Sequence, residues 1–476
     1  MTDKKHSGQV FTPPFLVSEI LDTVGYNNVT IINKHVMENS CGNGAFLTEI
    51  VRRYKANYAG NELQKHLETF IHGIELDENS YKECLKNLDE TAAEFGLKNV
   101  KWDIQNTDTL TVDCFNGKMD FVIGNPPYVR VHNLENYDAV KKFKFAEGGM
   151  TDLYLVFFEI GFNMLKKGGK LCYITPSSWI NSVAGSVLRQ NISCHHNLVK
   201  LIDLGHFQAF EATTYTMISL FEKDVIHETF EYQKYDTKVS ETLKIEETLI
   251  GNMMYLSDKK TLHELRNIYT TASKKYVQVK NGFATLADSV FIGDKFPFEN
   301  FLIPTIKAST GKWHLAFYPY DKNGKPQPKE KIFSDVKISD YLENHKDELL
   351  KGKTENENPD WYLYGRTQAL KDVWAQKYTI NTILKDVKSI KLNSVPSGSG
   401  VYSGLYILTS VNKEILAQII CNQDFINYIS VLKKYKSGGY YTFNSKELEM
   451  YLNYKLSNLF NDKSYVKQQN IFDSNI

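Results

Sequence analysis

Residues 36–50 read VMENSCGNGAFLTEI, and this stretch decides the fold. Its apolar start suits a short buried strand, glycines follow at positions 42 and 44, and an amphipathic pattern begins at Ala45. Glycine lets the backbone turn sharply, and the free N–H groups of a helix's first turn then face any ligand beyond the turn. A strand, a tight turn and a helix in this order predict the ligand-binding turn of a parallel α/β sheet.

The same alternation of apolar runs and helical patterns continues on both sides of this turn. Buried strands are predicted at residues 35–37, 70–76, 119–124, 170–175 and 198–203, and amphipathic helices at 45–58, 78–95 and 152–165. Asp77 suits a helix N-cap and Gly96 a helix end. Strands that alternate with helices predict an α/β fold with a mostly parallel sheet, which binds ligands at the carboxyl ends of its strands.

The length and composition of the chain restrict its class. With 476 residues the chain is longer than one core usually organises, so more than one domain is expected. It contains no apolar run of 18 residues, and its first 15 residues lack the apolar segment of a secretory signal, so we expect a cytoplasmic protein without a membrane span. The six cysteines form no CxxC pair and have no histidine partners at zinc spacing, which predicts free thiols and no metal site.

The net charge is zero, but the two halves of the chain differ. Residues 1–250 contain 25 Lys and Arg against 33 Asp and Glu, whereas residues 251–476 contain 31 against 23. Phosphate contacts act within a Debye length of about 8–10 Å, so a basic half can bind nucleic acid although the whole chain is neutral. The acidic, polar stretch 226–250 is predicted to be a linker between a first domain, 1–225, and a second domain, 251–476.

Acidic residues are expected where the predicted strands end. Glu38 ends the first strand, and a carboxylate there suits a ligand with an ammonium group. Glu75 ends the second strand, where an acid accepts from a ribose diol, although it lies 31 residues after Gly44 rather than about 20. Asp103 follows a further apolar run and would accept from an adenine amino group, with Ile104 packing on the ring.

The most specific local signal is MDFVIGNPPYVRV at residues 119–131. A buried strand ends there in Asn-Pro-Pro-Tyr, and two prolines cannot continue a central strand because neither has an N–H. The rigid turn presents the side-chain oxygen of Asn125 and the carbonyl of Pro126 as two acceptors beside the Tyr128 ring. These groups are the ones needed to hold an NH2 group on a planar ring or amide.

Taken in order, the motifs resemble those of the γ-group, TaqI-like N6-adenine DNA methyltransferases of restriction–modification systems. They are GQVFTPP (8–14), ENSCGNGAF (38–46), GIELD (73–77), Asp103 and NPPY (125–128). An early TPP segment ahead of the glycine turn, with the recognition region at the C-terminus, is the arrangement of that group. The resemblance covers most of residues 8–223 and extends more loosely into the second half. One departure is Asn39-Ser40, where the family usually has Pro-Ala.

The resemblance implies a class I methyltransferase domain that is Rossmann-like and binds S-adenosyl-L-methionine, followed by an α+β target-recognition domain. The implied cofactor-binding residues are Thr12, Pro13, Glu38, Cys41, Gly42, Gly44, Glu75, Asp103 and Ile104. The implied catalytic group is Asn125, Pro126, Pro127 and Tyr128. Tyr128 and Phe210 would stack on a flipped target base, with Phe207 as the substitute for Phe210.

The resemblance also implies the reaction and its partners. The methyl group would pass directly to the N6 atom of an adenine in a short sequence of double-stranded DNA. The chain would act as a monomer, either beside a separate cognate restriction endonuclease or as a solitary methylase. Three stretches are similar to the TaqI-like recognition domain, namely VKNGFATLADSVFI (279–292), WYLYGR (361–366) and KSGGYYTFNSKEL (436–448), and the candidates for phosphate contacts are Lys433, Lys434 and Lys436.

Three other functions use parts of the same pattern. Enzymes that methylate a glutamine amide on a partner protein also carry NPPY, but they have a helical N-terminal domain and no long C-terminal module. RNA amino-methylation is disfavoured for the same reason. A catalytically idle DNA-binding subunit would retain the cofactor fold, but the intact residues 125–128 argue against it.

Overall fold

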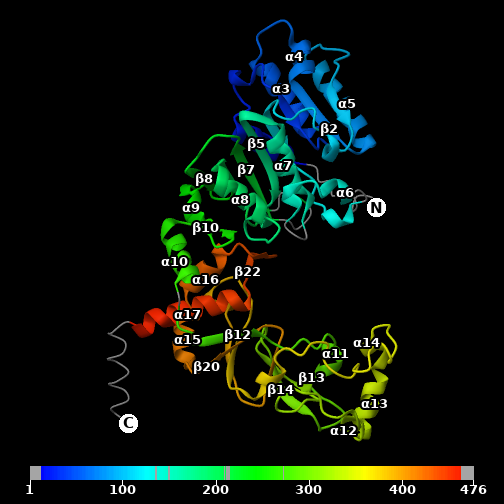
Figure 1. Cartoon of the computed structure of the whole chain (residues 1–476), viewed down its shortest axis with the longest axis vertical. Helices are drawn as coiled ribbons and strands as arrows, with labels where there is room; N and C mark the ends of the chain where they lie inside the picture. Colours follow the sequence, from blue (N-terminus) through cyan, green and yellow to red (C-terminus); the bar gives the residue numbers. More distant parts are fainter. Residues whose placement is uncertain are drawn as a thin grey trace. The chain divides into compact units, whose positions relative to one another are not determined.

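The computed structural model describes residues 12–134, 137–147, 151–207, 210, 215–271 and 273–461. The chain divides into two compact units, residues 1–264 and residues 265–476 (Figure 1). The strands of the first unit form one large sheet and a short hairpin, whereas those of the second form three smaller sheets. The two units are therefore described separately.

The first unit is built on a nine-stranded sheet with the strand order β3-β2-β1-β4-β5-β7-β6-β8-β9. Its strands are β1 (Val36–Glu38), β2 (Ile71–Glu75), β3 (Asp103–Asn106), β4 (Met119–Gly124), β5 (Leu165–Pro176), β6 (Leu198–Asp203), β7 (Thr216–Glu222), β8 (Thr229–Lys234) and β9 (Ser240–Lys244). Strands β1 to β5 are parallel, and β7 lies antiparallel between β5 and β6. This order confirms the predicted Rossmann-like α/β fold.

The helices of this unit connect the parallel strands. They are α2 (Pro14–Val24), α3 (Ala45–Asn57), α4 (Leu63–Phe70), α5 (Glu78–Ala93), α6 (Tyr137–Val140), α7 (Leu153–Met164), α8 (Ser186–His195) and α9 (Ile245–Thr248), with short 3-10 turns η1 (Val29–Ile31), η2 (Thr109–Thr111), η3 (Val131–Asn133), η4 (Lys144–Ala146) and η5 (Ser177–Ile180). The three helices predicted from periodicity correspond to α3, α5 and α7. The Asp77 carboxylate accepts the N–H of Ser80 at 2.8 Å, so it caps α5 as predicted.

The predicted linker at 226–250 is instead part of the sheet. Residues in it form β8 and β9, and the first unit continues to Glu264 through a hairpin of β10 (Leu249–Ile250) and β11 (Met253–Met254). In β8 the side chains of Phe230 and Tyr232 are buried, whereas the other residues of the strand are partly or fully exposed. One solvated face gives such a strand a largely polar sequence, so composition alone made it resemble a linker.

The second unit combines three small sheets with helices, as predicted for an α+β domain. The sheets have the orders β12-β20-β16-β18, β13-β15-β14-β19 and β17-β22-β21. Their strands are β12 (Val277–Asn281), β13 (Ile292–Gly293), β14 (Leu302–Lys307), β15 (Lys312–Phe317), β16 (Lys377–Ile380), β17 (Ile383–Leu384), β18 (Leu392–Val395), β19 (Gly400–Tyr402), β20 (Leu405–Thr409), β21 (Tyr435–Lys436) and β22 (Tyr440–Thr442).

Helices complete this unit and the boundary region. They are α10 (Lys259–Thr270), α11 (Asp288–Phe291), α12 (Lys329–Phe333), α13 (Val336–Asn344), α14 (Lys346–Leu350), α15 (Lys413–Ile420), α16 (Gln423–Val431) and α17 (Ser445–Asn461), with 3-10 turns η6 (Leu370–Trp374) and η7 (Val387–Ser389). An aromatic-rich core packs α11 to α14 against β14, β15 and the segment 361–373.

Two expectations about the whole chain can be compared with the structure. All six cysteines are free thiols, and those at positions 41, 84 and 172 are buried. Within the described ranges, none of the helices has both the length and the apolar character needed to cross a membrane.

Candidate active site

The sheet changes the direction of its strand order between β1 and β4. From β1 the sheet continues through β2 and β3 on one side and through β4 and β5 on the other. Ligands of open α/β sheets bind beyond the carboxyl ends of strands at such a switch point. Glu38 ends β1, and Asn125 directly follows β4. A Cβ atom added at Gly124 would lie 3.5 Å from the Cγ atom of Glu38, so the two strand ends adjoin each other.

Glu38 is a buried carboxylate with incomplete hydrogen bonding. The residue is 3% exposed, and the N–H of Leu47 in the first turn of α3 donates to it. Its Oε2 atom has no hydrogen-bond partner among the described residues. Burial raises the pKa of the Glu38 carboxyl well above its ordinary value, and nearby Cys84 and Glu75 raise it further. Because an unpaired buried carboxylate is costly, this atom fits a ligand that brings an ammonium group.

The glycine turn after β1 is fastened to Glu75 at the end of β2. The N–H of Gly42 donates to Oε2 of Glu75 at 2.7 Å, and the N–H of Asp77 donates to Oε1 at 2.8 Å. Gly44 has a φ of 82°, and a Cβ atom there would lie 2.8 Å from the Sγ atom of Cys84, so glycine is required. Burial raises the pKa of the Glu75 carboxyl. Each carboxylate oxygen retains another lone pair that can accept a ribose hydroxyl.

Polar contacts that the sequence did not reveal anchor the residues between β1 and the glycines. The side-chain oxygen of Asn39 accepts the Tyr173 hydroxyl at 2.9 Å, and its backbone carbonyl accepts the Thr109 hydroxyl at 2.6 Å. Cys41 is buried, and its N–H donates to the carbonyl of Ile74 at 2.9 Å. Asn39 stands where the resembling family usually has proline. The side-chain bond to Tyr173, which a proline could not form, therefore helps to fix this turn in place of a rigid ring.

Asp103 lies elsewhere in the sheet than the sequence pattern predicted. It begins β3 instead of following a strand, because residues 100–102 form no strand. Its carboxylate binds the Nδ1 atom of His72 at 2.6 Å. In the sheet register Asp103 pairs with His72, three residues, or roughly 10 Å, before the carboxyl ends at Glu75 and Asn106. The structure therefore does not bring Asp103 to the site.

Asp108 occupies the position that the sequence pattern gave to Asp103. It follows β3 at the carboxyl edge, and its Oδ1 atom accepts the N–H of Leu110 at 2.9 Å. Ile104 is buried within β3, and a Cβ atom added at Gly73 would lie 2.9 Å from its Cδ1 atom, so Ile104 packs against β2. The polar run QNTDT at 105–109 is the signal that could have located the end of this strand.

The Asn-Pro-Pro-Tyr turn after β4 is held from two sides. The Nδ2 atom of Asn125 donates to the Thr12 hydroxyl oxygen at 3.2 Å, which orients the amide with its Oδ1 atom turned away from Thr12. The Ser40 hydroxyl donates to the backbone carbonyl of Asn125 at 3.4 Å. Pro126 is buried and Pro127 is partly buried. The turn is therefore rigid where it adjoins the end of β1.

Thr12 and Pro13 directly precede α2. Thr12 is buried, and the carbonyl of Pro13 accepts the N–H of Leu16 at 3.0 Å, which begins the helix. Residues 8–11 of the GQVFTPP motif lie outside the described residues. The contact of Thr12 with Asn125 places the start of α2 beside the Asn-Pro-Pro-Tyr turn.

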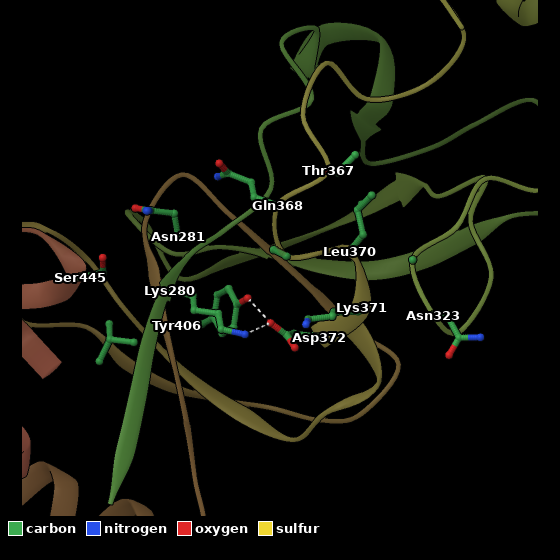
Figure 2. A pocket seen from close by; sticks show the side chains of 13 residues that line it. Lys280, Asn281, Asn323, Thr367, Gln368, Leu370, Lys371, Asp372, Tyr406 and Ser445 are labelled. Atoms are coloured by element: carbon green, nitrogen blue, oxygen red, sulfur yellow. Dashed lines mark hydrogen bonds and ion pairs between the residues drawn. The ribbon is translucent and has the colours of Figure 1, made fainter. Parts of the chain in front are cut away.

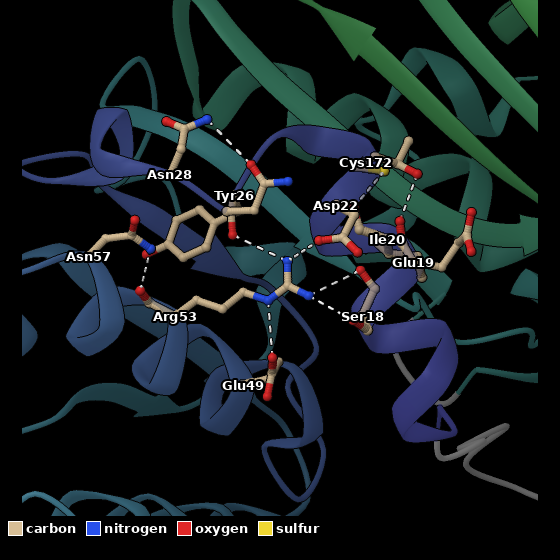
Figure 3. A network of polar contacts seen from close by, with 12 residues as sticks. Ser18, Glu19, Ile20, Asp22, Tyr26, Asn28, Glu49, Arg53, Asn57 and Cys172 are labelled. Carbon is tan, nitrogen blue, oxygen red and sulfur yellow. Dashed lines mark hydrogen bonds and ion pairs between the residues drawn. The ribbon is translucent and has the colours of Figure 1, made fainter.

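Arg53 of α3 holds α2, the helix that follows Thr12. Its guanidinium donates to the Asp22 carboxylate at 2.6 Å and to the Ser18 hydroxyl at 2.8 Å, and both acceptors belong to α2 (Figure 3). The Arg53 side chain is mostly buried. Because α3 begins at the glycine turn, Arg53 links the position of Thr12 to the position of that turn.

Tyr128 contacts Phe210, but the two rings do not form a sandwich. Their centroids are 6.4 Å apart with an interplanar angle of 78°, so they meet edge to face. The Tyr128 hydroxyl donates to the carbonyl of Ile174 at 3.1 Å, and burial raises the pKa of this hydroxyl well above its ordinary value, so it stays protonated. Phe207 contacts Phe15 instead, with centroids 6.0 Å apart. Of the two predicted partners, Phe210 is the one beside Tyr128.

The structure thus connects most of the predicted residues at one edge of the sheet. Thr12 contacts Asn125, the strand end before Asn125 adjoins Glu38, and Gly42 binds Glu75. The arrangement combines a buried acid for a cation, a second acid for a diol and a rigid amide. Asp103 and Ile104 are the predicted residues that lie apart from this group, within β3 rather than at its carboxyl end.

Comparison with known proteins identifies the family of this domain. Residues 41–210 match the family of the Eco57I restriction-modification methylase, so the first unit contains a methylase domain of the Eco57I type. The Type II methyltransferase M.BstVI of Geobacillus stearothermophilus is 25% identical over 60% of this chain and 60% of its own length. The Type II restriction enzyme and methyltransferase RM.Eco57I of Escherichia coli is 24% identical over 79% of this chain and 49% of its own length.

A third relative, the Type II methyltransferase M.XhoI of Xanthomonas vasicola, is 30% identical over 45% of this chain and 42% of its own length. The chain therefore spans 42–60% of the length of these relatives. The resemblance to γ-group restriction–modification methylases agrees with these matches, and S-adenosyl-L-methionine is the methyl donor of such domains.

Two solved structures are similar in fold. The Type IIL restriction-modification enzyme MmeI, solved in complex with DNA, has a TM-score of 0.58 at 11% identity over 90% of this chain and 64% of that chain. The DrdV–DNA complex has a TM-score of 0.53 at 12% identity over 90% of this chain and 53% of that chain. Because both likenesses cover 90% of the chain, they extend to the fold of the second unit.

Proposed function

We propose that this chain, whose first unit contains a methylase domain of the Eco57I type, transfers a methyl group from S-adenosyl-L-methionine to the N6 atom of an adenine in a short duplex DNA sequence. One observation carries the proposal. The rigid Asn125 amide directly follows the strand that adjoins Glu38, whose Oε2 atom is buried without a partner among the described residues. An acceptor for an amino group therefore lies next to a site suited to a cationic cofactor.

The residues at the carboxyl edge fit the parts of the cofactor. Glu38 would bind the methionine ammonium group, and Glu75 would accept the ribose hydroxyls. Asp108, rather than Asp103, would accept from the adenine amino group, because it follows β3 at this edge. Leu76 would cover the adenine ring, since its apolar side chain is 69% exposed directly after Glu75. When bound, the cofactor supplies a methyl group on a sulfonium, which is an electrophile.

The chain's own residues would prepare the amino group of the target. The lone pair of an aromatic amino nitrogen is delocalised into the ring, so this nitrogen is a poor nucleophile. The Oδ1 atom of Asn125 and the carbonyl of Pro126 would accept its two hydrogens and turn the lone pair out of the ring plane. Such fixed acceptors act by position and preorganised dipoles, which contribute several kcal/mol.

The target base must leave the duplex to reach this site, at a cost of a few kcal/mol. Stacking on an aromatic face returns about 1–3 kcal/mol per base. Because Tyr128 and Phe210 meet edge to face, we expect Phe210 to turn aside when a base binds, so that both rings face the base.

The second unit would hold the DNA. Residues 265–476 contain 29 Lys and Arg against 21 Asp and Glu, whereas residues 1–264 contain 27 against 35. A basic unit in the same chain as an acidic catalytic unit suits a polyanionic substrate. The similar structures of MmeI and DrdV were solved with DNA, which supports this role. We expect the chain to act as a monomer, which size-exclusion chromatography with light scattering would test.

The test uses the purified full chain with labelled S-adenosyl-L-methionine and, in separate reactions, duplex DNA, RNA and host protein. We expect label in DNA alone, and N6-methyladenine in the nucleosides after digestion. Label in 4-methylcytosine would keep the DNA substrate but refute the adenine specificity. Label in protein would select a glutamine-amide methylase, label in RNA an RNA methylase, and no label with intact cofactor binding an idle DNA-binding subunit.

A further inference from the structure

The second unit contains a polar pocket to which no role has been assigned so far. Its volume is about 530 Å³, within the range of ligand-binding pockets. Its walls come from the end of β12, the loop at 323–324, the segment 367–372 and the start of α17 (Figure 2). Amides, hydroxyls and lysines dominate the lining, and among the described residues Asp372 is its one acid.

Asp372 is neutralised inside the pocket wall. Lys280 forms an ion pair with its Oδ2 atom at 2.7 Å, and the Tyr406 hydroxyl donates to the same atom at 2.7 Å (Figure 2). Burial raises the pKa of the Asp372 carboxyl, but these two contacts outweigh it and hold the pKa below its ordinary value. The buried ammonium of Lys377 donates to the carbonyls of Asp372 and Ala375 at 2.7 and 2.9 Å, so the segment is rigid. The remaining lining groups therefore face the cavity without a competing negative charge.

Gln368 presents a defined pair of hydrogen-bonding groups. Its Nε2 atom donates to the carbonyl of Gly282 at 2.6 Å, which fixes the orientation of the amide. Its other N–H and its Oε1 atom make no hydrogen bond with any residue that the structure describes. One donor beside one acceptor matches the major-groove edge of adenine, where N7 accepts and the N6 amino group donates. Guanine presents two acceptors there, so it does not match.

Lys371 supplies a positive charge at the same pocket. Its side chain is exposed and forms no close ion pair among the described residues, although its charge helps to lower the pKa of Asp372. An unpaired lysine in a basic unit is suited to a DNA phosphate, which fixes the register of a protein on the duplex without reading its sequence. Lys434, in contrast, is already paired with Glu447, which makes it a weaker candidate for such a contact.

We infer that this pocket binds the target DNA, with Gln368 reading an adenine of the recognition sequence through its major-groove edge and Lys371 contacting a neighbouring phosphate. The inference rests on the proposed function and deepens it by naming residues that determine specificity. The assignment of adenine rests on the fixed orientation of the Gln368 amide, and the assignment of a phosphate contact rests on the exposed Lys371 in the pocket lining.

The test compares the full chain with Gln368→Ala and Lys371→Ala. Gln418→Ala and Lys353→Ala are matched controls, because both residues are exposed in the same unit and do not line the pocket. Sequencing of modified bases gives the methylation motif, and fluorescence anisotropy gives duplex affinity at several salt concentrations. Gln368→Ala should relax one adenine position of the motif, with discrimination there lowered about 5- to 150-fold. Lys371→Ala should weaken binding to all sequences. The slope of the logarithm of the binding constant against the logarithm of salt concentration should become shallower by about 1.

The outcomes separate this inference from the proposed function. If the unaltered chain methylates a DNA sequence but Gln368→Ala keeps the full motif, the assigned reading role is wrong and the proposed function stands. If Lys371→Ala leaves the salt dependence of DNA affinity unchanged, the assigned phosphate contact is wrong and the proposed function again stands. If the unaltered chain neither methylates nor binds duplex DNA, both proposals fail together. Melting temperatures of all variants show that any loss is not caused by unfolding.

Discussion

Replacement of Glu38 by glutamine should stabilise the free protein while it weakens cofactor binding. The carboxylate is buried, and its Oε2 atom has no partner among the described residues, whereas an amide of nearly the same shape carries no charge. An uncompensated buried charge costs more than an unpaired neutral amide, so we expect Glu38→Gln to raise the free energy of unfolding by about 1–2 kcal/mol. For a unit of this size the melting temperature should rise by about 2–8 °C.

The affinity for the cofactor should change in the opposite direction. A hydrogen bond to a charged group is worth about 1.5–3 kcal/mol, so the variant should bind S-adenosyl-L-methionine about 10- to 150-fold more weakly. Scanning fluorimetry without ligand and titration calorimetry with it measure the two effects. Glu75→Gln is the matched control, because both oxygens of Glu75 accept backbone N–H groups at 2.7 and 2.8 Å. That variant should lose stability as well as affinity.

The pH dependence of stability should also differ between the unaltered chain and Glu38→Gln. Burial raises the pKa of the Glu38 carboxyl in the folded chain, so between its ordinary and raised values the unfolded chain has lost a proton that the folded chain keeps. Stability of the unaltered chain therefore falls as the pH rises through this window, so the advantage of Glu38→Gln should grow through it and vanish at acid pH. As the pH is lowered, the unaltered chain should begin to lose cofactor affinity at a higher pH than it would if Glu38 had the pKa of an ordinary glutamate. A variant that is no more stable at neutral pH and binds the cofactor normally would refute the reasoning.

Three further substitutions test the remaining parts of the site. Asn125→Ala should lower kcat by about 10²–10³, as loss of a preorganised polar group does, while calorimetry shows a cofactor Kd within a few-fold; unchanged turnover contradicts its role. Thr12→Val removes the acceptor that orients the Asn125 amide and should cost about 1 kcal/mol, roughly fivefold, in kcat without unfolding the chain. Arg53→Ala should lower the free energy of unfolding by about 1.5–3 kcal/mol in denaturant titrations, because Asp22 and Ser18 lose their partner. Arg53→Lys should recover less than half of that loss, since lysine cannot reproduce the planar fork.

The sequence predicted the fold, and it predicted which strand ends bear most residues of the candidate site, because its strongest signals are local. The glycine turn and the proline turn both interrupt apolar strands, so each marks the carboxyl end of a strand without knowledge of the rest of the chain. Glu38 and Asn125 are positioned by these turns, and the structure brings their strand ends together. The register of neighbouring parallel strands then determines which acids share the edge.

The errors arose where a strand has little apolar sequence. In β3 only Ile104 is apolar and buried, so the pattern could not show that the strand begins at Asp103 and ends three residues later. In β8 one face is solvated, and its polar residues resembled a linker. The contact of Asn39 with Tyr173 joins residues 134 positions apart, which no local pattern encodes.

The choice of an amide at position 125 follows from the acid beside it. An amide offers a donor and an acceptor of almost equal shape, so it is selective only when its rotation is fixed, and the Thr12 hydroxyl fixes it here through the Nδ2 atom. An aspartate would also accept hydrogen bonds, but it would add a second carboxylate next to the strand end that adjoins Glu38. Two neighbouring carboxylates raise each other's pKa, so the charge that a cationic cofactor needs would be partly lost. Asparagine supplies the acceptor without that charge.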